Sequence, residues 1–295
     1  KNQRMGHEYV GTVVEVGEAV RSVKPGDFVV GSFCISCGKC ATCRSGYPSR
    51  CTTAASQGDA FVGMRAGGTQ AEYARIALAD GTLVKTPAPP TPEQLPSLLA
   101  ASDVLGTGWF AADEAGAAPG KTIVVVGDGA VGLGAIIGAK QLGASRIIAM
   151  SRHADRQALA RQFGATDIVE ERGEEGIARI KELTDGLGAD GVVEAVGNEA
   201  SFDQALGCVR PGGHLSFVGV PHGVSLDMGR MFGAEVHMFG GPAAVRKYLP
   251  TMIDLIYRGE INPGAVFDLV LPLEQAAEGY AAMDERRATK VMLTV

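Results

Sequence analysis

The sequence predicts an α/β fold in which a doubly wound parallel sheet accompanies a β-rich part. From Lys121 onwards, short apolar runs alternate with segments of helical periodicity, an order typical of a parallel sheet covered by helices. Before that point, short apolar runs are divided by turn residues, which is typical of a β-rich segment. The length of 295 residues corresponds to two domains at ~100–200 residues each.

The β-rich part contains four strand-like runs and a turn at Pro25-Gly26. We expect strands at 9–16, 27–33, 71–77 and 82–87. Five prolines then fall within 87–96, which marks the clearest linker in the chain. A helix is expected to follow this linker, near 97–113.

The second part begins with TIVVV, a continuous apolar run typical of a strand buried on both faces. We expect strands at 122–126, 146–150, 164–169, 191–197, 214–220 and 234–241. Helices are expected between them at 135–142, 155–163, 175–184 and 201–209. Beyond Gly241 the pattern gives a helix at 245–258, a strand at 265–271, a helix at 273–283 and a strand at 289–295.

Composition and charge exclude several classes of partner. The net charge is −6, which gives no electrostatic reason to expect nucleic acid or an anionic membrane. No apolar run reaches the ~18–20 residues that a membrane span needs. No signal peptide is visible at the start of the sequence, KNQRMGHEYVG. We therefore expect a cytoplasmic protein that binds small molecules rather than nucleic acid or a membrane.

A glycine-rich turn directly after TIVVV predicts a dinucleotide site. Gly127, Gly129 and Gly132 form G-x-G-x-x-G between a strand and a helix, and this context makes the motif specific. The three glycines permit, in order, the tight turn, the approach of the diphosphate and close packing of the helix. The diphosphate would lie at the helix N-terminus, facing free N–H groups. The alternative is a glycine-rich turn without a ligand.

The end of the second strand indicates which cofactor binds. A site for NAD places an acidic residue there to hold the ribose 2′-hydroxyl. This chain has Ser151 at that position, followed by Arg152 and, one turn later, Arg156. A guanidinium can bind the 2′-phosphate that a carboxylate would repel, so NADP(H) is favoured over NAD(H). The alternative for Arg152 is a solvated surface side chain.

Five of the six cysteines fall between Cys34 and Cys51, and this crowding indicates metal binding rather than disulfides. A short loop supplies four thiolates for a tetrahedral structural zinc: Cys37, Cys40, Cys43 and Cys51. Iron–sulfur clusters use similar runs and remain an alternative. Cys34 is either part of this run or a packing residue, and Cys208 is expected to be buried and inert.

The motifs make the chain similar to the zinc-dependent medium-chain dehydrogenase/reductase family, that of the alcohol dehydrogenases. They occur in the family's order: GHEYVGTVVEVG, VKPGD, CGKCATCRSGYPSRC, SDVLGTG, VVVGDGAVGLG, GATDIV, RPGGHLSFVGVP and KVMLT. The resemblance covers essentially the whole chain. It implies a GroES-like β-rich catalytic domain, into which a Rossmann domain is inserted. The expected bounds are 1–103 and 241–295 for the catalytic domain and 104–240 for the Rossmann domain.

The resemblance also implies a catalytic zinc and further cofactor contacts. His7 and Asp103 match zinc ligands, Glu8 matches an acidic neighbour that exchanges onto the metal, and Thr107 matches a residue that packs on the nicotinamide. Lys290 matches a basic residue near the cofactor phosphates. Alternatives are a structural histidine at position 7 and a helix N-cap at Asp103. The remaining expected cofactor contacts are Asp128, Ala130, Val131, His153, Val196, Gly219 and Val220.

One family feature has no counterpart in this sequence. The family's first zinc ligand and its proton relay precede the GHE motif, whereas no cysteine precedes Cys34 and the chain starts at Lys1. We expect that the natural protein carries a further N-terminal segment. The 295-residue polypeptide is then expected to bind NADP(H) and to turn over poorly.

The expected function is that of a zinc-dependent alcohol dehydrogenase. The resemblance implies hydride transfer between an alcohol and NADP(H), or between the cofactor and an aldehyde or ketone, with zinc acting as a Lewis acid. It also implies assembly as a homodimer or homotetramer. The alternatives are a zinc-free quinone or enone reductase on the same scaffold, and a catalytically silent NADPH-binding protein.

Overall fold

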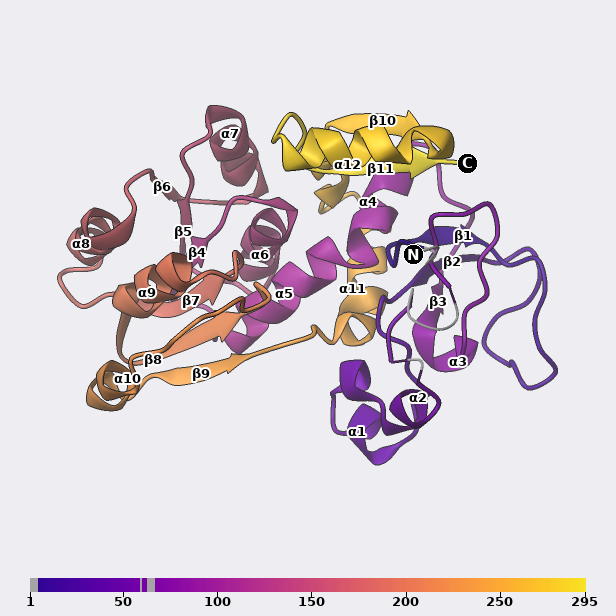
Figure 1. Ribbon diagram of the computed structural model, residues 1–295, viewed down its shortest axis with the longest axis horizontal. Coiled ribbons are helices and arrows are strands. Elements are labelled where there is room, and N and C mark those ends of the chain that lie inside the picture. The colour runs from indigo at the N-terminus through magenta and orange to yellow at the C-terminus, as the bar shows by residue number, and fades with distance from the viewer. Residues whose placement is uncertain (1–4, 59, 63–66) are drawn as a thin grey trace. The chain divides into compact units, whose positions relative to one another are not determined.

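The computed structural model describes residues 5–58, 60–62 and 67–295 (Figure 1). The chain forms two compact units. The discontinuous unit combines Lys1–Gly106 with Ala244–Val295, and the continuous unit is Thr107–Ala243. Among the described residues, no helix combines the length and the apolar character needed to cross a membrane.

The continuous unit is built on a parallel sheet of six strands in the order β6-β5-β4-β7-β8-β9 (Figure 1). The strands are β4 Thr122–Val126, β5 Arg146–Met150, β6 Asp167–Val169, β7 Ala189–Glu194, β8 Val209–Phe217 and β9 His237–Gly240. All five neighbouring pairs are parallel. The strand order reverses between β4 and β7, the point where such sheets bind ligands. The predicted doubly wound parallel sheet is therefore confirmed.

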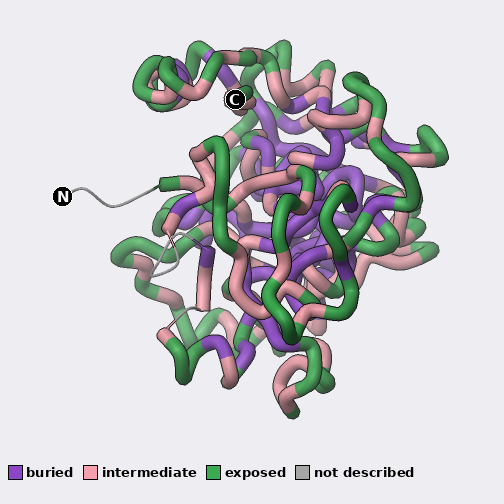
Figure 2. Tube along the Cα trace, turned by 90° about the vertical axis from the view of Figure 1, so that its right-hand side faces the viewer, coloured by how far each residue is buried: buried purple, intermediate pink, exposed green. Residues whose placement is uncertain are grey.

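Helices cover this sheet and bury its apolar strands. They are α5 Val104–Glu114, α6 Ala130–Gln141, α7 Ala154–Phe163, α8 Gly173–Leu183, α9 Glu199–Cys208 and α10 Met228–Ala234. The interior residues of β4 and β5 are buried, and residues of α8 and α9 join the same core. In Figure 2, buried stretches of the chain are purple and exposed stretches are green. The continuous apolar runs of the sequence thus become strands covered on both faces.

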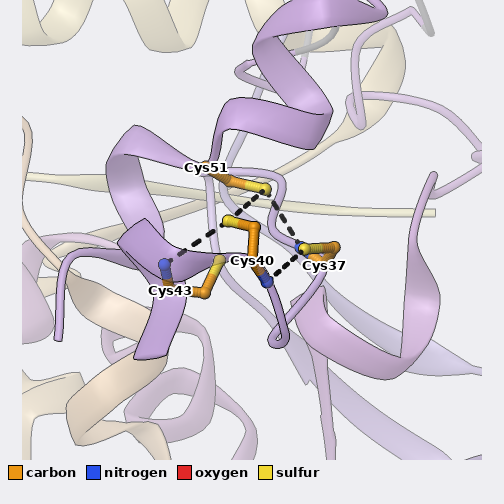
Figure 3. A group of neighbouring side chains, drawn as sticks. All are labelled: Cys37, Cys40, Cys43 and Cys51. Carbon is orange, nitrogen blue, oxygen red and sulfur yellow. Dashed lines mark hydrogen bonds between the residues drawn. The ribbon is translucent and has the colours of Figure 1, made fainter. Parts of the chain in front are cut away.

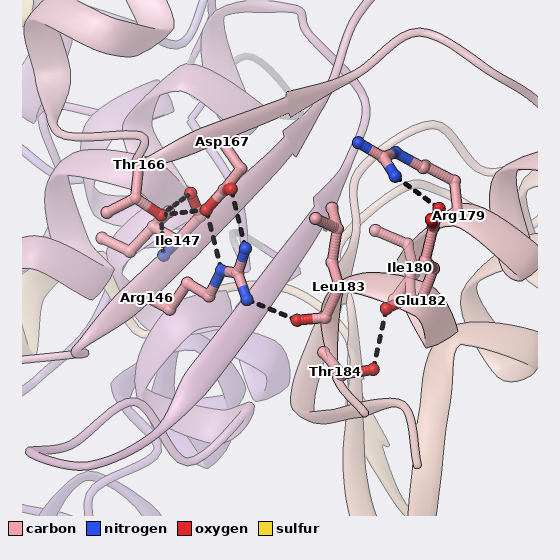
Figure 4. A network of polar contacts seen from close by, with 9 residues as sticks. All are labelled: Arg146, Ile147, Thr166, Asp167, Arg179, Ile180, Glu182, Leu183 and Thr184. Atoms are coloured by element: carbon pink, nitrogen blue, oxygen red, sulfur yellow. Dashed lines mark hydrogen bonds and ion pairs between the residues drawn. The ribbon is translucent and has the colours of Figure 1, made fainter. Parts of the chain in front are cut away.

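A polar network ties β5, β6 and the end of α8 together (Figure 4). Arg146 makes two bonds to the Asp167 carboxylate, each of 2.8 Å, and donates to the carbonyl oxygen of Leu183. The Thr166 hydroxyl also donates to Asp167 at 2.6 Å. The Arg146 guanidinium holds the pKa of the Asp167 carboxyl at about 2, well below its usual range. A bidentate arginine–carboxylate pair fixes the relative orientation of the two side chains and also stabilises the fold.

Asp167→Asn is expected to destabilise the protein by about 1 kcal/mol at neutral pH, measured by urea unfolding. A carboxylate whose folded pKa is depressed stabilises the fold above its unfolded pKa, and this stabilisation is lost as the pH falls through the folded pKa. The difference in the free energy of unfolding between wild type and variant should therefore decrease as the pH falls from about 4 towards about 2. Glu182→Gln is the control, because its pair with Arg179 is exposed and should contribute little. An equal loss of stability in the Asp167 and Glu182 variants would contradict the prediction.

The discontinuous unit contains two small sheets. Strands β1 Val10–Thr12, β2 Phe28–Gly31 and β3 Leu83–Lys85 form an antiparallel sheet, and β10 Leu269–Pro272 pairs in parallel with β11 Val291–Thr294. The helices are α1 Ala41–Arg44, α2 Thr52–Ser56, α3 Ala79–Thr82, α4 Leu95–Ala101, α11 Val245–Tyr257 and α12 Ala276–Asp284. Short 3-10 turns lie at Pro48–Arg50, Pro263–Val266 and Leu273–Gln275.

Two expectations about this unit's elements are wrong. The run 71–77 forms no strand, because most of its residues are exposed and no described strand pairs with it; Tyr73 is 72% exposed. The helix expected near 97–113 is two helices, α4 and α5, which are separated at Ser102 and Asp103. The Ser102 hydroxyl donates to the carbonyl oxygen of Leu99, and such local bonds compete with continuation of a helix.

Candidate functional site

The loop from Cys37 to Cys51 brings four sulfur atoms together (Figure 3). The ligand atoms all lie within 4.8 Å of one another, and they belong to Cys37, Cys40, Cys43 and Cys51. Two of these residues are also helix N-caps, because Cys40 precedes α1 and Cys51 precedes α2. The sequence folds in this way locally because each sulfur accepts a backbone N–H at the start of its short helix.

The surroundings of the four sulfurs suit a bound cation. Backbone N–H groups donate to Cys51 and Cys37 at 3.3 Å. Hydrogen bonds from the N–H of Cys43 and the side chain of Thr52 lower the pKa of the Cys40 thiol to about 5, whereas burial raises the pKa of the Cys43 thiol to about 12. Four mutually close thiolates repel one another unless a cation lies between them, and zinc accepts tetrahedral sulfur ligation. The donor set therefore fits a structural zinc. Cys34 is buried outside this group.

A second group of metal-ligating side chains joins distant parts of the sequence. His7 Nε2 lies 2.9 Å from Asp103 Oδ2, and Glu8 completes a set whose ligand atoms lie within 4.8 Å of one another. His7 follows Gly6, and Asp103 lies in the break between α4 and α5. The bond to Asp103 raises the pKa of His7, and burial raises the pKa of Glu8. One imidazole and two carboxylates are ligands that zinc accepts.

Lys290 lies beside this group rather than in solvent. Its ammonium forms an ion pair with the Glu8 carboxylate, and both side chains are mostly buried, with 18% and 19% exposed. The same unit contains a cavity of about 990 Å³, whose walls include His7, Glu8 and Lys290. Most of the other lining residues are apolar. A small molecule in this cavity can therefore reach the His7 side chain.

The glycine turn has the shape that the motif requires. Gly127 has a φ of 117°, a conformation that L side chains rarely adopt. A Cβ at Gly132 would lie 1.9 Å from the carbonyl oxygen of Gly127, whereas a Cβ at Gly129 would meet open space. Helix α6 starts at Ala130 without a side-chain cap or an acidic residue in its first turn, which includes Val131. Its first N–H groups are thus suited to an anion.

The end of β5 contains an ion pair that the sequence did not reveal. The Ser151 hydroxyl donates to Asp128 Oδ2 at 2.7 Å, and Arg156 Nη1 lies 3.3 Å from Asp128 Oδ1. Burial alone would raise the pKa of Asp128, but Ser151 and Arg156 lower it below its ordinary value. Arg156 is thus paired with a carboxylate of the glycine turn itself. Arg152 and His153 are exposed at the start of α7.

Sequence reasoning missed one residue here, Arg172. It precedes α8, and its guanidinium donates to the carbonyl oxygens of Met150 at 3.2 Å and Glu171 at 3.2 Å. Burial and the nearby charge of Arg152 lower the pKa of Arg172. Arg172 is therefore held by the Met150 carbonyl oxygen at the carboxyl end of β5, and Arg152 lies near it. The sequence feature that could have identified Arg172 is its position as a basic residue shortly after β6.

The other expected cofactor contacts lie at the carboxyl edge of the sheet or next to it. Val196 follows β7, and Gly219 and Val220 follow β8; the two valine side chains are 48% and 67% exposed. Thr107 lies in the first turn of α5. The structure thus brings the β7 and β8 loops to the same edge as the glycine turn, because all three strands are parallel.

Comparison with known proteins decides the family. A model described as the alcohol dehydrogenase GroES-like domain matches residues 2–88, and one described as zinc-binding dehydrogenase matches residues 130–258. A zinc-type alcohol dehydrogenase B of Aspergillus flavus is 36% identical over 98% of this chain and 68% of its own length. The chain belongs to the zinc-dependent medium-chain dehydrogenase/reductase family.

Other relatives in this dehydrogenase family agree. A probable zinc-binding alcohol dehydrogenase of Mycobacterium tuberculosis is 37% identical over 96% of the chain and 71% of its own length. The solved structure of an alcohol dehydrogenase from Thermus sp. ATN1 matches with a TM-score of 0.88 and 34% identity, covering 100% of this chain and 84% of that one. The GroES-like and Rossmann architecture expected from the sequence is thereby confirmed, as is membership among the zinc-type oxidoreductases.

Proposed function

We propose that this protein is a zinc-dependent alcohol dehydrogenase that transfers a hydride between an alcohol or carbonyl substrate and NADP(H). The observation that carries the proposal is the approach of His7 to Asp103 at 2.9 Å, across 96 residues of sequence, beside Glu8 and the cavity. Family membership supports the same chemistry, since relatives are described as alcohol and L-threonine dehydrogenases.

His7, Asp103 and Glu8 are the residues that would hold the catalytic zinc. When bound, zinc would polarise the substrate oxygen, and the nicotinamide would accept or return the hydride. Lys290 orients the Glu8 carboxyl group through their ion pair. The cavity's mainly apolar wall, including Leu95, Leu99 and Phe267, favours an apolar alcohol, aldehyde or ketone.

Metal analysis and cofactor titration test this function. We expect two zinc ions per chain, one on the four cysteines and one on the His7 group. Alcohols and aldehydes should be turned over with NADP(H) in a zinc-dependent manner but slowly, because the sequence has no counterpart of the family's first zinc ligand and proton relay. One zinc with tight NADPH binding and no turnover would favour a catalytically silent binding protein. No zinc with reduction of quinones or enones would favour the zinc-free reductase.

Arg172→Ala is expected to weaken NADP(H) binding by about tenfold or more and to leave NAD(H) binding unchanged. Arg172 donates to the Met150 carbonyl oxygen at the end of β5 and lies near Arg152, and a charge-assisted hydrogen bond to phosphate contributes about 1.5–3 kcal/mol. Fluorescence titration of each reduced cofactor measures the effect. Arg161→Ala is the control, because Arg161 is exposed in the last turn of α7.

Two outcomes would count against this cofactor preference. If Arg172→Ala weakens the binding of NADP(H) and NAD(H) equally, Arg172 only supports the end of β5, through its hydrogen bond to the Met150 carbonyl oxygen. Tighter binding of NAD(H) than NADP(H) by the unaltered protein would mean that the Asp128 carboxylate receives the ribose 2′-hydroxyl instead. The proposed preference for NADP(H) would then be wrong.

A further inference from the structure

Glu194 is a fully buried carboxyl group in the middle of the sheet's carboxyl edge. It is the last residue of β7 and is 0% exposed. In register it lies between Val126, the last residue of β4, and Phe217, the last residue of β8. It therefore lies beside the reversal of strand order, next to the glycine turn.

The Glu194 side chain organises the loop that follows it. Its Oε1 accepts hydrogen bonds from the backbone N–H of Val196 at 2.9 Å, the N–H of Gly197 at 2.8 Å and the hydroxyl of Ser201 at 2.7 Å. Three donors on one oxygen fix both the turn and the start of α9. The position of Val196 thus depends on this carboxyl group.

The same residue also fixes the loop after β8. The carbonyl oxygen of Glu194 accepts the N–H of Val218 at 2.9 Å and of Gly219 at 3.3 Å. A Cβ at Gly219 would lie 2.6 Å from Glu194 Oε2 and 2.3 Å from the backbone nitrogen of Gly197. The two loops are therefore packed directly on each other, with no space for a side chain at Gly219.

Two exposed valines project from these loops. Val196 and Val220 are 48% and 67% exposed, although both are apolar. Val196 also packs on the glycine turn, because a Cβ at Gly127 would lie 3.0 Å from its Cγ2. In the sheet, β5 lies on one side of β4 and β7 lies on the other. A dinucleotide whose diphosphate binds the glycine turn after β4 would therefore extend one end over β5 and the other over β7. The valines are on the side away from Ser151.

The second oxygen of Glu194 has no hydrogen-bond partner among the described residues. A buried carboxyl oxygen without a donor is costly. An amide oxygen could accept the same three hydrogen bonds that Oε1 accepts. Glutamine is therefore the variant that keeps the two loops in place and removes only the ionisable group.

We propose that Glu194 is a positioning residue for the cofactor, and this inference rests on the proposed function. It holds Val196 and Val220 as an apolar shelf beside the glycine turn, on which the nicotinamide half of NADP(H) lies. The residue acts through the two loops and touches neither substrate nor cofactor.

Two variants and two ligands test the role of Glu194. Glu194→Ala should raise the Kd for NADPH about tenfold or more, while the Kd for 2′-phospho-ADP, the adenosine half, stays unchanged. Glu194→Gln should restore NADPH binding to near the wild-type level. Hydrogen exchange of the backbone at 195–201 and 218–222 should accelerate in the alanine variant only. The inference would be overturned if Glu194→Ala weakened the binding of NADPH and 2′-phospho-ADP equally, or if Glu194→Gln bound NADPH as weakly as Glu194→Ala.

Gly219→Ala keeps the test usable if Glu194→Ala does not fold. Its added methyl group would push against the Glu194 carboxyl and the Gly197 nitrogen, so the loops should separate although Glu194 is intact. We expect the same selective loss of NADPH affinity; an unchanged NADPH affinity would count against the shelf. If the unaltered protein binds neither NADPH nor NADH, the proposed function itself fails. If it binds NADPH and all variants bind equally well, only the role of Glu194 fails.

Discussion

Replacing Cys40 by serine is expected to remove one of the two zinc ions and to destabilise the loop from Cys37 to Cys51. Serine still provides an oxygen to cap α1, so the change isolates the loss of the sulfur ligand. The core beneath this loop is small, with Ile35, Ala54 and Val62 as its buried aliphatic members, and contributes little without the metal. We expect the free energy of unfolding of the discontinuous unit to fall by about 4 kcal/mol or more. Zinc analysis, thermal unfolding and limited proteolysis within 37–56 measure it.

Cys34→Ala is the matched control for this experiment. Cys34 is as deeply buried as Cys51 but lies outside the four-sulfur group, so both zinc ions should remain bound. Retention of two zinc ions by the Cys40 variant would show that the loop does not depend on that sulfur. Iron instead of zinc in the unaltered protein would identify a cluster in place of the structural zinc.

Replacing His7 by alanine is expected to remove the other zinc and to reduce zinc-dependent alcohol oxidation by at least about 10³-fold. The imidazole is the only nitrogen ligand in this described metal group, and two carboxylates without it hold zinc poorly. The four-cysteine zinc should stay, because its ligands belong to a separate loop. NADPH affinity should also stay, since the glycine turn belongs to the continuous unit.

His237→Ala is the control for the His7 variant. His237 is exposed on β9 and stacks on His214, with ring centroids 4.9 Å apart, so its removal should change neither metal content nor turnover. Unchanged zinc content in the His7 variant would contradict the proposed ligand. A loss of NADPH binding together with the zinc would indicate general misfolding instead.

The sheet was predictable because its strands are continuous apolar runs. Segments such as 122–126 and 146–150 can be buried on both faces only inside a parallel sheet, so sequence alone placed them correctly. The run 71–77 was misassigned because a strand also needs a neighbour, and pairing is not encoded locally. Helix α10 was missed because its seven residues leave Met228 and Phe232 exposed, so they show no periodic buried face.

Motif spacing identified the candidate metal groups but not the contacts around them. His7 and Asp103 were paired from family motifs, and their separation of 2.9 Å agrees with that pairing. The ion pairs of Lys290 with Glu8 and of Arg156 with Asp128 depend on tertiary packing across many residues. Glu194 gave no signal at all, because a lone glutamate at a strand end has no motif. Long-range polar contacts of this kind require the structure.

The ion pair between Glu8 and Lys290 joins residues that are 282 positions apart, and this places a constraint on biosynthesis. The ribosome adds about 5–20 residues per second, so roughly 15–60 s pass between the synthesis of these two residues. The continuous unit is complete once Ala243 has been made, before Lys290, so it can start to fold first. The His7 group lacks its lysine partner until Lys290 emerges from the ribosome. Assembly of the metal centre is therefore expected to follow the folding of the continuous unit.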